Sequence, residues 1–199
     1  MPSPSLLPVT AGESRVAALR RLTRGSHERL DHAVMACGIF QDRQRFTRFV
    51  RMQYRFHVDI APLHARADLA AHFPDLPARA RLAHVASDLR DLGVQPDPYE
   101  GTPGLCHAAL PEALGWLYVA EGSSLGAAIL LKLAAPLGLH AGFGATHLAP
   151  AASGVASHWR AFTDALDRIV LPADAEAQVV EGANAAFASV HAHLRDVFA

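Results

Sequence analysis

Apolar residues recur at helical spacing along most of this chain. In residues 14–36 one face runs, in steps of three and four, through Val16, Leu19, Leu22, Ser26, Leu30, Ala33 and Cys37. This spacing predicts an amphipathic helix, which Gly38 is well placed to end. A second helix is predicted to begin after Asp42, a residue type that caps helix N-termini, and to kink or end at Pro62. A third helix is expected over 77–92, with Gly93 after its end.

The second half of the chain begins with a segment that has no helical period. Residues 94–107 contain three prolines and two glycines, which predicts a surface connection. Pro111 suits the first turn of the next helix, and residues 113–135 are apolar on almost every side, as in a central buried helix. The last two helices are predicted over 157–169 and 173–198. No alternating strand pattern of useful length is present, so the sequence predicts an all-α, single-domain helical bundle.

Composition agrees with one domain. The chain has 199 residues, of which 51% are hydrophobic, enough for one sizeable core and too few for two. The N-terminus has three prolines within residues 1–10 and lacks the basic and apolar regions of a signal peptide. We therefore predict a disordered leader over 1–12 and a folded domain over 13–199.

Charge and the length of the apolar runs exclude several kinds of partner. The formal charge is −1, from 18 basic and 19 acidic side chains, so we expect no binding to nucleic acid or to an acidic membrane surface. The longest apolar runs, 113–120 and 125–131, are far shorter than the roughly 20 residues that cross a bilayer. Two cysteines, Cys37 and Cys106, allow at most one disulfide. We expect a soluble, cytoplasmic monomer.

Three side chains on the first predicted helix form a candidate metal-binding group. His27 and Asp31 are one turn apart, and Arg20 lies two turns before His27 on nearly the same side. An imidazole here can bind a metal through one nitrogen while the Asp31 carboxylate holds the N–H of the other, which fixes the tautomer. Arg20 could meet a carboxylate at the rim of the same ligand. The alternative is an ordinary pair of surface side chains, with Arg20 in solvent.

Two glycines weaken the predicted central helix. Gly122 and Gly126 each cost about 1 kcal/mol relative to alanine in a helix interior, and Ser123 and Ser124 add hydroxyls to a buried element. The missing side chains would let the backbone approach a flat ligand and leave a gap for a diatomic molecule. Together with His27 this indicates a haem held between two helices. The alternative is close packing of two helices through a Gly-x-x-x-Gly notch.

Other metal and catalytic motifs are missing from the sequence. No Glu-x-x-His pattern supports a di-iron bundle, and His57 and His64 are expected at the surface or at the edge of the core. His191 and His193 would point in different directions on a helix. The chain has no glycine-rich phosphate loop, Cys-x-x-Cys pair or nucleophile elbow.

Three stretches of the chain carry a family resemblance. They read Ser-His-Glu-Arg-Leu-Asp over 26–31, Leu-Tyr-Val-Ala-Glu-Gly-Ser-Ser-Leu-Gly-Ala-Ala over 117–128, and Phe-Gly-Ala-Thr-His-Leu-Ala over 143–149. In order and spacing the chain resembles the bacterial haem oxygenases from about Leu19 to its C-terminus, most closely the type used by Gram-negative bacteria for iron acquisition. The resemblance favours haem over the alternative interpretation of either motif.

The resemblance implies roles at the haem rim and on its proximal side. His27 would be the axial ligand of the haem iron, and Asp31 would hold its second nitrogen. Arg20 and Tyr118 would bind haem propionates.

On the distal side, the resemblance places Gly122, Ser123 and Gly126 on the helix above the iron. Phe187 and Val190, on the last helix, would be walls of the pocket.

The reaction implied by the resemblance is oxidative cleavage of haem, which is both substrate and cofactor. Oxygen activated at the iron would attack a meso carbon of the porphyrin, and biliverdin, carbon monoxide and ferrous iron would be released. Electrons would come from a separate ferredoxin or flavin reductase. A neutral imidazole ligand suits this reaction because it lacks the strong electron push by which a thiolate favours O–O cleavage.

The chain departs from its relatives at positions that affect the product. Ser123 stands where mammalian-type enzymes have a distal aspartate, so protons would arrive through water held by the backbone and Ser123. Met35 and Leu133 stand where some iron-acquisition relatives have lysines that rotate the haem. We therefore predict cleavage at the α meso carbon.

Two other functions fit parts of the sequence. A non-catalytic haem carrier would bind through His27 but would not need the distal glycines. A helical hydrolase of the thiaminase type would need a cysteine nucleophile, and neither Cys37 nor Cys106 lies in a supporting acid–base pattern.

Overall fold

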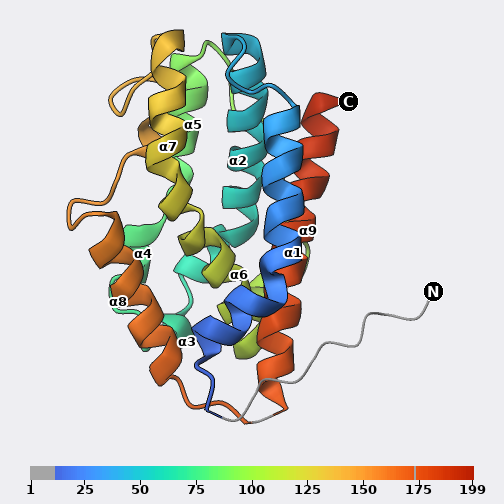
Figure 1. The fold of residues 1–199 in the computed structure, drawn as a ribbon, viewed down its shortest axis with the longest axis vertical. Helices are drawn as coiled ribbons and strands as arrows, with labels where there is room; N and C mark the ends of the chain where they lie inside the picture. The colour runs from blue at the N-terminus through green and yellow to red at the C-terminus, as the bar shows by residue number, and fades with distance from the viewer. Residues whose placement is uncertain (1–11, 173) are drawn as a thin grey trace.

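The computed structural model describes residues 12–172 and 174–199, which form a bundle of helices (Figure 1). Its longer helices are α1 (Arg15–Ala36), α2 (Arg43–His64), α5 (Leu82–Asp91), α6 (Leu110–Gly122), α7 (Ser124–Ala134), α8 (Val155–Arg168) and α9 (Ala175–Phe198). The short elements are α3 (Ala67–Ala70), α4 (Leu76–Arg79), η1 (Leu105–His107), η2 (Ala135–Leu137) and η3 (Thr146–Leu148). No strand occurs within the described residues, which confirms the all-α prediction. Of the predicted leader, residues 1–11 lie outside the described residues.

Side-chain caps begin the first two helices, and the cap at Asp42 was predicted. Ser14 Oγ accepts a hydrogen bond from the N–H of Ala17 at the start of α1, and Asp42 Oδ1 accepts one from Arg45 at the start of α2. Gly38 follows α1 with a φ of +61°, in the left-handed region that favours glycine. Pro62 lies in the last turn of α2, where the helix ends two residues later.

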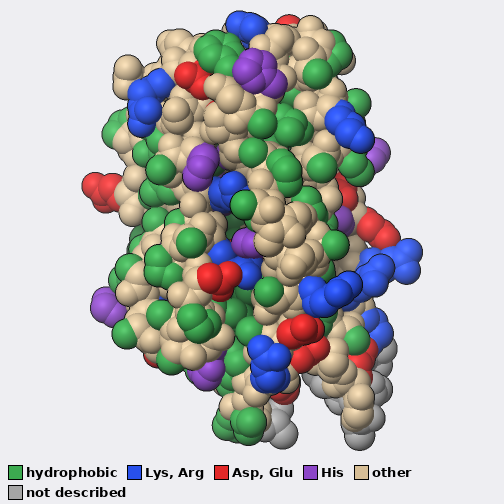
Figure 2. All heavy atoms as spheres, turned by 90° about the vertical axis from the view of Figure 1, so that its left-hand side faces the viewer, with side chains coloured by type: hydrophobic (Ala, Val, Ile, Leu, Met, Phe, Trp, Pro, Cys, Tyr) green, Lys and Arg blue, Asp and Glu red, His purple; other side chains and the backbone are tan. Residues whose placement is uncertain are grey.

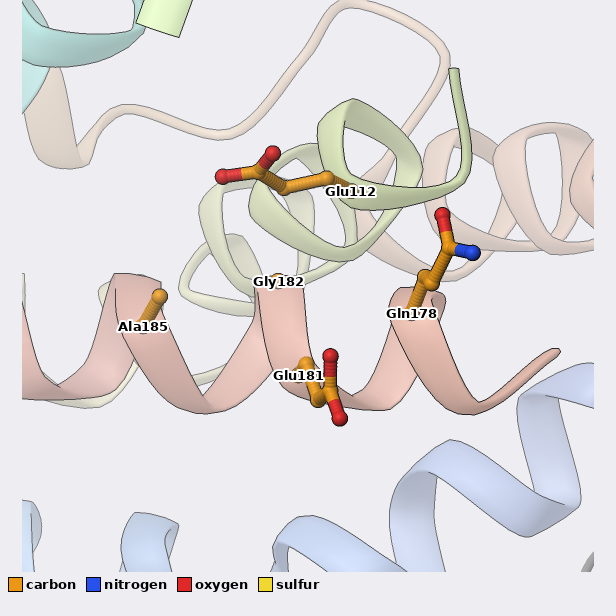
Figure 3. A pocket seen from close by; sticks show the side chains of 5 residues that line it. All are labelled: Glu112, Gln178, Glu181, Gly182 and Ala185. Atoms are coloured by element: carbon orange, nitrogen blue, oxygen red, sulfur yellow. The ribbon is translucent and has the colours of Figure 1, made fainter. Parts of the chain in front are cut away.

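Helix α6 lies in the core and is packed closely along α9. A Cβ on Gly115 would overlap backbone atoms of Val179 and Ala183, and a Cβ on Gly182 would overlap the backbone of Glu112. Figure 3 shows this crossing, with Gly182 facing the α6 ribbon. Close contact of two helices through glycine therefore occurs in this fold, but at Gly115 and Gly182.

The predicted helix over 113–135 is broken in two, so that prediction was wrong in its continuity. α6 ends at Gly122, Ser123 lies between the helices, and α7 begins at Ser124. Ser123 Oγ donates to the carbonyl of Ala120, and Ser124 Oγ donates to that of Glu121, each at 2.7 Å. Serine hydroxyls that bond to nearby carbonyls compete with helical hydrogen bonds, and Gly122 adds backbone freedom.

The predicted helix over 77–92 is also two elements, α4 and α5. Ala80, between them, has an extended backbone with ψ of 129°. The side chain of Arg79 turns inward to bind Asp75 and Glu121, which ties α4 to the core separately from α5.

The segment Leu110–Leu137 is long and apolar enough to cross a membrane by length and composition. In the fold, however, its first half is the core helix α6, and Glu121 within it forms a buried ion pair. Its second half, α7, exposes apolar side chains on one face. The core and that face account for the apolar composition.

Candidate functional site

His27 and Asp31 form the contact expected from their spacing. His27 Nδ1 lies 3.1 Å from Asp31 Oδ2, and the two side chains are 60% and 66% exposed. A carboxylate only accepts hydrogen bonds, so a neutral His27 that turns its N–H toward Asp31 carries its proton on Nδ1. Nε2 is then left with a free lone pair on an exposed face of α1, which is the form of imidazole that binds iron.

Contacts with α9 hold this part of α1 in place. Ser26 Oγ bonds to Asn184 Oδ1 at 2.8 Å, and Asn184 Nδ2 donates to the carbonyl of Val180. The ring of Phe187 meets the ring of His27 edge to face, with centroids 5.9 Å apart. Phe187 therefore limits the rotation of the imidazole, while Val190, the other predicted wall residue, is buried in the core.

Apolar side chains are exposed on α7 and on α1. Leu125, Ile129 and Leu133 on α7 are 46%, 63% and 42% exposed, and Met35 on α1 is 51% exposed. Figure 1 shows the two helices apart, with α2 visible between them. Exposed apolar side chains on two such helices are typical of a surface that binds an apolar ligand.

The two distal glycines have different surroundings. A Cβ on Gly126 would meet nothing within 4 Å, whereas one on Gly122 would lie 3.7 Å from the Trp159 ring. No helix backbone packs on either glycine, in contrast to Gly115. Gly126 therefore leaves open space on the surface of α7.

Ser123 is exposed at the break between α6 and α7. Its hydroxyl proton is donated to the carbonyl of Ala120. Its oxygen can still accept a hydrogen bond, so Ser123 could orient water but could not at the same time donate to a ligand. Its predicted part in proton delivery stays a prediction.

Arg20 and Tyr118 lie near each other. Burial raises the pKa of the Tyr118 phenol, and the positive charge of Arg20 opposes that rise. The Tyr118 ring also packs against Trp159, with centroids 5.7 Å apart. A cation beside a protonated phenol offers two kinds of hydrogen-bond donor to a carboxylate.

Several buried polar groups were missed by the sequence analysis. His57 and His64 were expected near the surface, but both are buried because α2 packs against α5, α6 and α9. Burial, with help from neighbouring His147 and His64, lowers the pKa of His57 to about 3. His147 Nδ1 lies 2.6 Å from Asp88 Oδ2. The pair could not be found from spacing, although His147 lies within the resembling stretch 143–149.

A separate hollow lies between the first halves of α6 and α9 (Figure 3). It is lined by Glu112, Gln178, Glu181, Gly182 and Ala185. None of the predicted site residues lines it, so it is distinct from the face that carries His27.

Comparison with known proteins gives matches over nearly the whole chain. A family model described as "Heme oxygenase" matches residues 14–196. Heme oxygenase PigA of Pseudomonas aeruginosa is 45% identical over 175 residues, 87% of each chain. A solved structure of the heme oxygenase from Neisseria meningitidis, described with NO and CO bound, matches with a TM-score of 0.86 at 37% identity, over 93% of this chain and 92% of that one. The residues matched by the family model include α1, α6, α7 and most of α9.

Proposed function

Because this chain belongs to the haem oxygenase family, we propose that it cleaves haem to biliverdin, carbon monoxide and ferrous iron for iron acquisition. Membership makes it an oxidoreductase that binds haem and degrades it with O2. We assign the site to the faces of α1 and α7 that carry His27 and Gly126, with haem as both substrate and cofactor.

The observation that carries this site is the state of His27. Asp31 lies 3.1 Å from Nδ1, which leaves Nε2 as the nitrogen available to iron, and α7 offers an apolar face with no side chain at Gly126. In the proposed site Nε2 binds the iron and Asp31 raises its basicity. The surface of α7 around Gly126 covers the opposite side of the haem and restricts how oxygen can lie.

The rim and the distal face complete the proposed site. Arg20 and Tyr118 bind a propionate, which fixes the rotation of the haem about its iron. Gly122 and Ser123 bring the backbone of the distal break toward the ligand, and water bound there supplies protons. Met35 and Leu133 are apolar, so neither of these two positions attracts a propionate, and the α meso carbon is the proposed point of cleavage.

The proposed electron donor is a ferredoxin or flavin reductase that docks beside the haem edge. Arg20, Arg24 and Arg29 are exposed on the same helix as His27, although Arg24 pairs with Glu28. Exposed cations near a redox centre favour an acidic partner and raise its association rate. We propose that the protein acts as a cytoplasmic monomer.

Adding haem, a reductant and oxygen to the protein tests this function. Loss of the Soret band with formation of biliverdin supports the oxygenase. A stable Soret band would identify a haem carrier instead, and the absence of any haem spectrum would refute the site. Chromatography of the biliverdin isomers tests regiospecificity, and a mainly β or δ product would contradict cleavage at the α carbon.

A further inference from the structure

A buried ion pair lies directly behind the distal break. Arg79 Nη1 donates to Glu121 Oε2 at 2.6 Å, and the side chains are 2% and 6% exposed. Glu121 is the residue before Gly122, in the last turn of α6. The ion pair therefore restrains the backbone at the point where α6 ends.

Arg79 joins three elements through one guanidinium. Besides Glu121 on α6, it binds Asp75 at the start of α4 at 2.8 Å and reaches the carbonyl of His158 on α8. Its charge also lies over the Phe162 ring, 5.7 Å from the centroid. Figure 2 views the molecule from the left-hand side of Figure 1, where α7 and α8 lie. At the middle of this face, charged and histidine side chains gather among hydrophobic ones.

Two consecutive residues of α8 contact this region. His158 Nε2 lies 3.1 Å from Arg79 Nη1, from which a neutral ring accepts a hydrogen bond, and 3.2 Å from Glu121 Oε2. The next residue, Trp159, covers Gly122. Burial lowers the pKa of His158, which keeps its ring neutral beside Arg79. Burial also raises the pKa of Glu121, but Arg79 opposes this and favours the carboxylate. The charge on Glu121 is thus balanced by Arg79.

The break itself has little stiffness of its own. Gly122 has no side chain, and the hydroxyls of Ser123 and Ser124 bond to carbonyls within α6. A buried ion pair stabilises a fold no better than well-packed apolar side chains, but its bonds are satisfied in only one arrangement. The direction in which α7 leaves α6 is therefore fixed by the contact of Arg79 with Glu121 at the end of α6.

We propose that Glu121 and Arg79 are positioning residues for haem cleavage, which set the angle between α6 and α7 and so the height of the Gly126 surface above the haem. This inference rests on the proposed function. Loosening the pair changes how a diatomic ligand is held and which meso carbon is attacked. It leaves haem affinity nearly unchanged, because His27 is held from α1 and α9.

The test is Glu121→Gln, which keeps the shape and removes the charge. In the haem complex we expect the carbon monoxide dissociation rate to change by at least about fivefold. A change of this size is at the lower end of the usual energetic coupling between two sites in a protein. We also expect a broader mixture of biliverdin isomers. Because the two residues act as a unit, Arg79→Gln combined with Glu121→Gln should change the rate no more than the larger single effect.

Glu176→Gln is the matched control. Glu176 binds Arg15, a buried arginine that also donates to the carbonyls of Leu166 and Ile169, away from the distal break. Both variants should lower the Tm, and only Glu121→Gln should move the ligand rate and the isomers. The proposal would be overturned if the two variants showed the same loss of Tm and both kept the wild-type carbon monoxide dissociation rate and biliverdin isomer ratio.

If Glu121→Gln fails to fold, Arg79→Lys keeps the charge but has fewer donors and is measured in the same way. An unchanged dissociation rate and isomer ratio in that variant also overturns the inference. A wild-type protein that binds haem without cleaving it would refute the proposed oxygenase, while the carbon monoxide rate would still test the positioning role.

Discussion

An exposed imidazole with one nitrogen engaged and the other free is the residue on which the proposed site depends. We expect His27→Ala to lose the axial bond and the cleavage of haem while keeping its fold, because the side chain is exposed and supports little of the core. The absorption spectrum of ferric haem with the variant and its turnover are the measurements. His32→Ala, which removes another exposed histidine of α1, is the control. Normal turnover by His27→Ala would refute the ligand assignment.

Asp31 acts through His27 in this scheme. Removing the partner of a metal-bound histidine typically lowers metal affinity or activity about 10–100-fold. We expect a loss of that size for Asp31→Ala, measured as haem dissociation constant and turnover. A variant indistinguishable from wild type would mean that the His27–Asp31 contact is an ordinary surface pair.

His57 makes stability depend on pH. Its pKa is lowered to about 3 in the fold, against about 6.5 in an unfolded chain. The unfolded chain therefore binds more protons below pH 6.5, so this contribution to stability is complete above pH 6.5 and is lost as the pH falls toward 3. Relative to His57→Gln, the free energy of unfolding of haem-free wild type should fall by about 1.4 kcal/mol per pH unit in this window. Urea unfolding at several pH values measures it, and parallel curves would contradict it.

Sequence distance explains which site residues could be predicted. His27 and Asp31 contact each other within one helix, where spacing fixes direction. Arg79 and Glu121 are 42 residues apart, and Asp88 and His147 are 59 apart, so the fold alone brings them together. Their sequence surroundings carry no local signal for an ion pair.

At the scale of elements, two glycines within helices have opposite surroundings, because Gly115 is packed against α9 and Gly126 faces open space. We expect Gly115→Ala to destabilise the fold by at least about 1–3 kcal/mol, because the new methyl group would overlap α9. Gly126→Ala should instead stabilise it by up to about 1 kcal/mol, since it adds helix propensity in open space. Urea unfolding of the haem-free variants measures both changes. Equal changes in the free energy of unfolding would contradict the view that Gly115 is closely packed and Gly126 is not.

A larger side chain at position 126 tests the distal surface directly. Gly126→Leu should fold, because among the described residues no atom outside its own stretch of α7 lies within 4 Å of its Cβ position. It should weaken binding of haem or of carbon monoxide, because the side chain would fill the space above the proposed iron position. Unchanged haem and carbon monoxide affinities would show that Gly126 does not face the ligand.

Helix existence was easier to predict than helix continuity. Apolar periodicity identified the longer helices, because burial of one face dominates their stability. The break at Ala80 was missed because the contacts that favour it, such as that of Arg79 with Glu121, come from other parts of the chain. The glycines and serines near 123 were recognised as costly in a helix, but the cost was attributed to a ligand and not to a bend.

At the scale of the whole molecule, ligand binding should be visible as stability. Haem that binds the folded chain alone, at about 100 times its dissociation constant, adds about 2.7 kcal/mol. For a domain of this size that corresponds to a rise in Tm of about 5–10 °C. Thermal unfolding with and without haem measures it. His27→Ala should show a smaller rise, and an equal rise would indicate binding that does not involve the iron.

The glycine contacts between α6 and α9 also bear on how the product leaves. Gly115 and Gly182 allow α6 no room to roll or slide on α9, and α9 in turn carries Phe187 against His27. We therefore expect α1, α6 and α9 to move together. The product of the proposed reaction, an open-chain tetrapyrrole, is bulkier than a flat macrocycle, so its exit would require a wider gap. We expect α7 to provide this wider gap by moving about Ser123, so that the rate of product release depends on that short stretch of backbone.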